Sequence, residues 1–141
     1  MILLDSDHLT VLKYRGSERH IRLTERLQAA ADDAVGTTII NVEEQMRGWL
    51  ASLAKERAVL RQVTAYRELA MLFDFFSKLH LAPFSADAAS RFQDLRAAGV
   101  KIGTMDLKAA CVALVHQATF LTANRKDFEK VPGLHFENWS D

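Results

Sequence analysis

Four carboxylates spaced widely along this sequence are the side chains best suited to catalysis. They are Asp5, Glu44, Asp106 and Asp127. Carboxylate oxygens favour Mg²⁺ or Mn²⁺ over zinc, and Mg²⁺ typically binds one or two carboxylates directly while keeping several waters. Such an ion can lower the pKa of a bound water and neutralise charge that builds on a phosphate. These residue types therefore indicate metal-assisted hydrolysis of a phosphodiester bond, with Asp5, Asp106 and Glu44 as candidate metal ligands.

Alternating strand and helix patterns supply the elements that must position these acids. Short apolar or β-branched runs predict strands over residues 2–4, 35–40, 81–84, 119–122 and 134–136. Apolar residues at helical spacing predict helices over residues 8–14, 18–31, 42–80, 86–98 and 105–116. The segment 42–80 should divide into two or three helices with a break within 56–66, and Pro83 indicates an edge strand. The alternation predicts an α/β protein, a three-layer α/β/α domain with a mostly parallel sheet of four or five strands.

Polar residues at the expected helix starts are candidate N-caps. Ser6 or Asp7 is expected to cap the first helix, and Asn41 the helix that follows the second strand. For Asp7, an outer-shell role toward a metal or a water is the alternative to capping. Ser85 and Thr104 are expected to cap the helices over 86–98 and 105–116. Capping also offers a purely structural role for Asp5, and the helix dipole offers one for Asp106.

The topology of a parallel sheet determines where the four acids meet. Right-handed crossovers bring the carboxyl ends of the strands and the starts of the following helices to one edge of the sheet, where ligands bind. Asp5, the pair Glu43 and Glu44, Asp106, and the pair Asn124 and Asp127 all fall at such positions, so we expect them to lie close together. Because like charges at close range raise one another's pKa and oppose folding, a bound cation would stabilise the group.

The composition limits the class of protein. A chain of 141 residues that is 49% hydrophobic fits one folded domain over residues 1–141. Its 18 basic and 18 acidic residues cancel, so binding of nucleic acid would need a local patch or a cation rather than bulk charge. Cys111 is the only cysteine, which excludes an internal disulfide and favours a reducing cytoplasm. We expect neither a signal peptide nor a membrane-spanning helix.

Four short motifs follow one another along the chain. They are Ile-Leu-Leu-Asp-Ser-Asp-His-Leu over 2–9, Glu-Gln-Met-Arg-Gly over 44–48, Ile-Gly-Thr-Met-Asp over 102–106 with Ala-Ala soon after, and Leu-Thr-Ala-Asn-Arg-Lys-Asp-Phe over 121–128, followed by Val-Pro-Gly-Leu and Glu-Asn-Trp. In this order and spacing they resemble the motifs of the PIN-domain ribonucleases, and specifically of the VapC-type toxins of bacterial toxin–antitoxin pairs. The resemblance extends from residue 2 to residue 139.

The resemblance implies a function and partners that the residues alone do not reveal. It implies a Mg²⁺-dependent endoribonuclease toxin that cuts cellular RNA, forms a homodimer and is bound by a cognate antitoxin protein at its active site. The apolar surface of segment 43–80 is a candidate contact for the second copy or the antitoxin. Asp5 and Asp106 are expected to be the principal metal ligands. Glu44 and Asp127 are expected to complete the site and position the attacking water.

Two positions of the resemblance have alternatives. The second acid is doubled as Glu43 and Glu44, and Glu44 is chosen for its distance from Gly48. The fourth acidic position is filled either by Asn124, where some members carry aspartate, or by Asp127. The five histidines show no spacing typical of metal ligands and are interpreted as structural or surface residues; they are His8, His20, His80, His116 and His135.

Two other functions also fit parts of the sequence. Asp5 and Asp7 after an apolar strand match the Asp-x-Asp opening of haloacid-dehalogenase-like phosphatases, in which the first aspartate attacks phosphorus. That class usually has a later pair of acids, whereas Asp32 and Asp33 lie in the wrong place for it. A non-catalytic module of the same fold, which only binds protein or RNA, is the second alternative. A pure binding surface has little use for clustered carboxylates, so metal-dependent ribonuclease activity is preferred.

Overall fold

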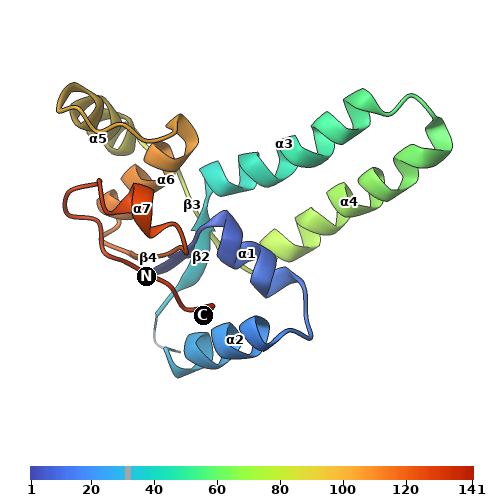
Figure 1. Ribbon diagram of the computed structural model, residues 1–141, viewed down its shortest axis with the longest axis horizontal. Coiled ribbons are helices and arrows are strands. Elements are labelled where there is room, and N and C mark those ends of the chain that lie inside the picture. Colours follow the sequence, from blue (N-terminus) through green and yellow to red (C-terminus); the bar gives the residue numbers. More distant parts are fainter. Residues whose placement is uncertain (31–32) are drawn as a thin grey trace.

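The computed structural model describes residues 1–30 and 33–141, and within them the strands form one parallel sheet of five (Figure 1). The strands are β1 (Ile2–Leu4), β2 (Val35–Thr38), β3 (His80–Ala82), β4 (Thr119–Leu121) and β5 (Phe136–Glu137). They lie in the order β3-β2-β1-β4-β5, and each neighbouring pair is parallel. The prediction of a mostly parallel sheet with the third strand at an edge is therefore confirmed.

Helices cover both faces of this sheet. They are α1 (Ser6–Lys13), α2 (Glu18–Ala29), α3 (Ile39–Lys55), the 3-10 helix η1 (Val59–Gln62), α4 (Val63–Ser77), α5 (Ala86–Ala97), α6 (Thr104–Val115) and α7 (Arg125–Phe128). Strand side chains alternate between the two faces: Leu3 and Phe120 pack with α5, α6 and α7, whereas Leu4 and Leu121 pack with α1 to α4. The predicted three-layer α/β/α architecture is confirmed.

The apolar helix α6 is the centre of one of these two cores. Its side chains from Leu107 to Ala113 are almost all buried. Cys111 is fully buried there, and burial raises the pKa of its thiol to about 11. A thiol with so high a pKa is unreactive, which fits an inert core residue. The first turn of α6 reaches the carboxyl edge of the sheet and carries Asp106.

Helices α3 and α4 form an antiparallel arm that projects away from the sheet (Figure 1). The turn between them contains η1 and lies within the predicted break at 56–66. Gln62 closes this turn, because its side-chain amide donates to the carbonyl of Glu56 at 2.7 Å. The arm exposes large apolar side chains, among them Leu50, Val59, Leu60, Val63, Tyr66, Met71 and Phe73.

Three predicted caps are wrong. Helices α1 and α3 begin directly after strands β1 and β2 without an intervening loop, whereas α6 follows the loop after α5. The N-cap of α1 is Asp5 rather than Ser6 or Asp7. Thr38 caps α3 in place of Asn41, and Gly103 precedes α6 in place of Thr104, which is its first residue.

Other boundaries agree more closely with the sequence. Ser85 caps α5 as predicted. The expected helix 18–31 begins and ends close to α2, although its last residue, Ala31, lies outside the described residues. Across residues 1–30 and 33–141, none of the helices has the length and hydropathy needed to span a membrane.

Candidate active site

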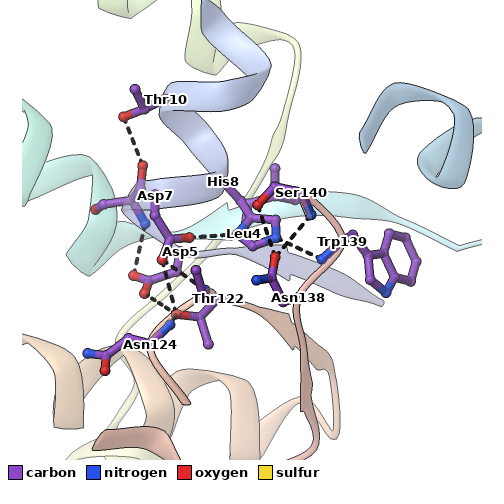
Figure 2. A network of polar contacts seen from close by, with 12 residues as sticks. Leu4, Asp5, Asp7, His8, Thr10, Thr122, Asn124, Asn138, Trp139 and Ser140 are labelled. Carbon is purple, nitrogen blue, oxygen red and sulfur yellow. Dashed lines mark hydrogen bonds and ion pairs between the residues drawn. The ribbon is translucent and has the colours of Figure 1, made fainter. Parts of the chain in front are cut away.

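Asp5 lies at the junction of the central strand β1 and helix α1, and it is the most buried acid of the site. Only 7% of it is exposed. Its Oδ1 accepts hydrogen bonds from the Ser6 backbone N–H at 2.8 Å and from Nδ2 of Asn41 at 2.9 Å. Its Oδ2 accepts one from Oγ1 of Thr122 at 2.8 Å (Figure 2). Three elements that meet at the carboxyl edge of the sheet therefore fix this carboxylate.

The protonation of Asp5 is strongly perturbed. Burial, followed by the nearby charge of Asp7, raises the pKa of Asp5 from 3.8 to about 6. The hydrogen bonds from Thr122, Ser6 and Asn41 act in the opposite direction without cancelling these effects. Ionised Asp5 is thus an unfavourable buried anion that a cation would stabilise, and perturbed carboxyls of this kind are typical of functional sites.

Asp7 lies one helical position beyond Ser6, and hydrogen bonds hold both of its oxygens. Its Oδ1 lies 2.6 Å from Nδ1 of His8, and its Oδ2 accepts the Ala123 backbone N–H at 2.9 Å. Burial alone would raise the pKa of Asp7, but the contacts with His8 and Ala123 outweigh it and the pKa is lowered. Asp7 is therefore an anchored anion beside Asp5, and it does not cap α1 as the sequence suggested.

The segment after β4 brings Asn124 and Asp127 to the same edge. Asn124 caps the short helix α7, because its Oδ1 accepts the Asp127 backbone N–H at 3.3 Å. Its Nδ2 also donates to Oδ2 of Asp127 at 3.0 Å. The two candidates for the fourth acidic position are therefore in contact. Asn124 orients the carboxylate, and Asp127 supplies the charge.

Asp106, in the first turn of α6, is the acid whose pKa other acids of the site raise. Burial raises its pKa first, and the charges of Glu44, Asp127 and Asp7 raise it further. The charges of three acids from α3, α7 and α1 thus act on Asp106. Such repulsion between like charges opposes folding unless a cation offsets it.

The doubled acid at the start of α3 separates into two different environments. Glu43 forms an ion pair with Arg47 at 2.6 Å, one helical turn further along α3. The charge of Glu44 instead raises the pKa of Asp106. This arrangement supports the choice of Glu44 over Glu43.

The donor set fits a hard divalent cation held partly through water. Carboxylate and amide oxygens are the ligands that Mg²⁺ and Mn²⁺ prefer. Within the described ranges, no three His, Cys, Asp or Glu side chains are gathered tightly enough to hold a metal by themselves. Mg²⁺ does not require such a cage, because it commonly binds one or two carboxylates and retains several waters. Asp5 and Asp106 are the acids with raised pKa values and hence the best candidates.

Reasoning from the sequence gave three residues of this site a different main role. Asn41 was expected to be a cap, but it is buried and donates to both Asp5 and Oγ of Ser6. Asp7 was expected chiefly to be a cap, with an outer-shell role toward metal or water as the second interpretation, and His8 was interpreted as a structural or surface residue. A signal for Asp7 and His8 was available, because both occupy the first turn of a helix that begins at the first catalytic candidate.

The fold and the acidic edge together define a PIN domain. A family model for the PIN domain matches residues 2–134, so the chain belongs to this family. A relative named Ribonuclease VapC2, from Rickettsia felis, is 38% identical over an alignment of 69 residues that covers 46% of this chain and 52% of the relative. The match therefore spans about half of the length of that relative.

Solved structures resemble the chain over nearly its whole length. VapBC2 from Rickettsia felis, bound to a DNA fragment from its promoter, superposes with a TM-score of 0.74 at 26% identity, covering 99% of both chains. DNA-bound VapBC from Salmonella typhimurium gives a TM-score of 0.75 at 22% identity, covering 98% of this chain and 97% of that one, and it supports the fold alone. The resemblance to VapC-type PIN-domain proteins that the four motifs indicated is confirmed.

Proposed function

We propose that this protein is a divalent-metal-dependent endoribonuclease and the toxin of a toxin–antitoxin pair. The observation that carries the proposal is electrostatic: the charges of Glu44, Asp127 and Asp7 raise the pKa of Asp106, and the charge of Asp7 also raises the pKa of the buried Asp5. Membership of the PIN family and the likeness to a protein named as a ribonuclease support it. The family match also leaves the phosphatase alternative without support.

Asp5 and Asp106 would hold the metal ion, and we propose Mg²⁺, with Mn²⁺ as a substitute. When bound, such an ion supplies a water of lowered pKa and neutralises charge on the phosphate. Asn41 and Thr122 orient the carboxylate of Asp5. Glu44 and Asp127, whose charges raise the pKa of Asp106, would accept hydrogen bonds from the attacking water. The reaction proposed is direct hydrolysis of an RNA phosphodiester without a covalent enzyme intermediate.

We further propose a cognate antitoxin and a second copy of the chain as protein partners, with the cytoplasm as the place of action. The similar structure from Rickettsia felis is a VapBC complex, which supports the antitoxin as a partner. The arm supplies an apolar surface for such contacts. A hollow of about 250 Å³ at its base is lined by Val42, Met46, Leu72, Phe73, Phe76, Ser77 and Leu81.

The proposal is tested by RNA cleavage with protein freed of any bound partner, in Mg²⁺, in Mn²⁺ and in EDTA. Asp106→Asn should abolish cleavage while leaving the fold intact. Asp94→Asn, which changes an exposed acid on α5, is the matched control and should cleave like the wild type. Folded wild type that cuts none of several RNA classes in either metal would favour the non-catalytic binding module instead.

A further inference from the structure

His8 is a fully buried histidine next to the acidic site, and both of its ring nitrogens have partners. Nδ1 lies 2.6 Å from Oδ1 of Asp7, and Nε2 lies 3.1 Å from the backbone nitrogen of Trp139 (Figure 2). Asp7 and His8 are neighbours in sequence, whereas Trp139 belongs to the C-terminal segment. The histidine therefore connects the end of the chain to the start of α1.

The two partners select one tautomer of the His8 ring. A backbone N–H can only donate, so Nε2 must present its lone pair to Trp139. The proton of the neutral ring then resides on Nδ1, from which it is donated to the carboxylate of Asp7. The hydrogen bond of one ring nitrogen sets the role of the other, as in the histidine–carboxylate pairs found at metal sites.

The hydrogen bonds continue from Asp7 to Asp5 through Thr122. Oγ1 of Thr122 lies 3.3 Å from Oδ2 of Asp7 and donates to Oδ2 of Asp5 at 2.8 Å. The Ala123 backbone N–H fixes the same oxygen of Asp7 at 2.9 Å. A displacement of Asp7 would therefore move the threonine that orients Asp5.

The C-terminal segment is held in place independently of the acidic site. The guanidinium of Arg26 on α2 lies 4.6 Å from the ring centroid of Trp139, in cation–π contact. The indole N–H of Trp139 donates to Oε1 of Glu137 at 3.2 Å. The backbone N–H that faces His8 is thus presented by an anchored residue, so it can impose the tautomer.

We propose that His8 is a positioning residue: its tautomer, selected by Trp139, fixes Asp7 and thereby orients Asp5 through Thr122 for metal binding. This inference rests on the proposed metal-dependent function. It assigns no direct contact between His8 and the metal or the RNA. It also gives Asp7 the role of an anchored acceptor between His8 and Thr122.

Two amide substitutions of His8 distinguish a positioning role from a packing role. In His8→Asn the amide nitrogen can replace Nδ1 as the donor to Asp7, and the acceptor for Trp139 is lost. In His8→Gln the amide oxygen can replace Nε2 as that acceptor, and the donor to Asp7 is lost. Mn²⁺ binding measured by calorimetry should weaken roughly 10–100-fold in His8→Gln, a typical cost of losing an outer-shell partner. His8→Asn should bind Mn²⁺ nearly as tightly as the wild type.

Equal Mn²⁺ affinities in the two variants, or a larger loss in His8→Asn, would overturn the inference. If His8 only packed in the core, the variant that keeps the donor to Asp7 would bind Mn²⁺ no more tightly than the other. NMR of ¹⁵N-labelled wild type without metal provides a test that does not depend on whether the variants fold. We expect a protonated Nδ1 and an unprotonated Nε2 at neutral pH, and the opposite tautomer would refute the proposal.

Failure of the proposed function is a separate result. If the wild type binds Mn²⁺ and the two variants differ as expected, but no RNA is cut, the ribonuclease function fails and the positioning role of His8 stands. If the wild type cuts RNA and the variants bind Mn²⁺ equally, the positioning role fails and the ribonuclease function stands.

Discussion

Replacement of Asp5 by asparagine should stabilise the metal-free protein while destroying its metal site. The substitution removes the charge of the most buried acid at the edge and keeps its size. The carboxyl of Asp5 has its pKa raised from 3.8 to about 6, chiefly by burial and then by the charge of Asp7. Ionised Asp5 therefore costs stability in the folded protein whenever no cation is bound.

The size of this cost follows from the raised pKa of Asp5. One pKa unit corresponds to about 1.4 kcal/mol, so a rise from 3.8 to about 6 corresponds to about 3 kcal/mol of lost stability. Below pH 4 Asp5 is protonated in the folded and the unfolded protein alike, and its charge costs nothing. The cost grows as the pH rises from about 4 to 6 and is complete above pH 6.

The asparagine variant can retain the hydrogen bonds of the site. Its amide oxygen can accept from the Ser6 N–H and from Asn41, as Oδ1 of Asp5 does. Its amide nitrogen can donate to Oγ1 of Thr122, whose own proton can turn to Oδ2 of Asp7 at 3.3 Å. The gain of about 3 kcal/mol is thus an upper bound, reduced by the energy of this rearrangement.

Urea denaturation in EDTA at pH 4 and at pH 7 measures this effect. At pH 7 the free energy of unfolding of Asp5→Asn should exceed that of the wild type by up to about 3 kcal/mol, which corresponds to a Tm higher by roughly 6–12 °C. At pH 4 the two proteins should differ little in stability. Added Mg²⁺ should then stabilise the wild type alone, by about 2.7 kcal/mol at 100 times its Kd. Asp94→Asn controls for the general effect of removing an acid.

A variant that is less stable than the wild type at pH 7 would refute this reasoning, as would a difference that does not change between pH 4 and pH 7. The first result would mean that the hydrogen bonds to Asp5 outweigh its burial. The second would mean that the pKa of Asp5 is close to its value in the unfolded chain.

Glycine substitutions test the packing of the sheet, and the pH dependence of Mn²⁺ binding tests the metal site. Gly36→Ala should destabilise the fold by about 3 kcal/mol or more, because a Cβ there would lie 1.9 Å from the His80 carbonyl oxygen of the adjacent strand. Gly48→Ala in α3, where a Cβ meets nothing within 4 Å, should instead stabilise the fold by roughly 0.4–1 kcal/mol. Equal unfolding midpoints in urea for the two glycine variants would contradict the close contact between β2 and β3. The Mn²⁺ affinity of the wild type should fall as the pH drops below about 6, the pKa of Asp5, by roughly tenfold per pH unit, because the proton competes with the metal. A constant affinity from pH 7 to pH 5 in calorimetric titrations would exclude Asp5 as a ligand.

The general plan of the fold could be predicted because it depends on local patterns. Alternating apolar strands and amphipathic helices indicated the parallel sheet, and parallel topology placed the acids at one edge. The order of the strands could not be obtained in this way, because it depends on which strands pair across the sheet. The helix starts were misplaced by up to three residues, since Thr38 and Asp5 serve both as strand ends and as caps.

The detailed chemistry of the edge was less accessible from the sequence. The expectation that Asp106 lies near other acids came from position alone, but the hydrogen bonds that hold Asp5 come from Asn41 and Thr122, which are distant in sequence. The role of His8 could not be read locally, because its second partner, Trp139, lies 131 residues away. Local patterns therefore indicate which side chains approach the edge, and tertiary contacts determine how each one is held and protonated.

The central claim is that the acidic edge holds a divalent metal that enables RNA cleavage. Its most direct test measures Mn²⁺ occupancy and RNA cleavage on the same samples of wild type and Asp5→Asn, over a range of Mn²⁺ concentrations. We expect cleavage by the wild type to rise with occupancy and to stop in EDTA, and Asp5→Asn to show neither binding nor cleavage. Undiminished cleavage in EDTA, or by folded Asp5→Asn, would contradict the account.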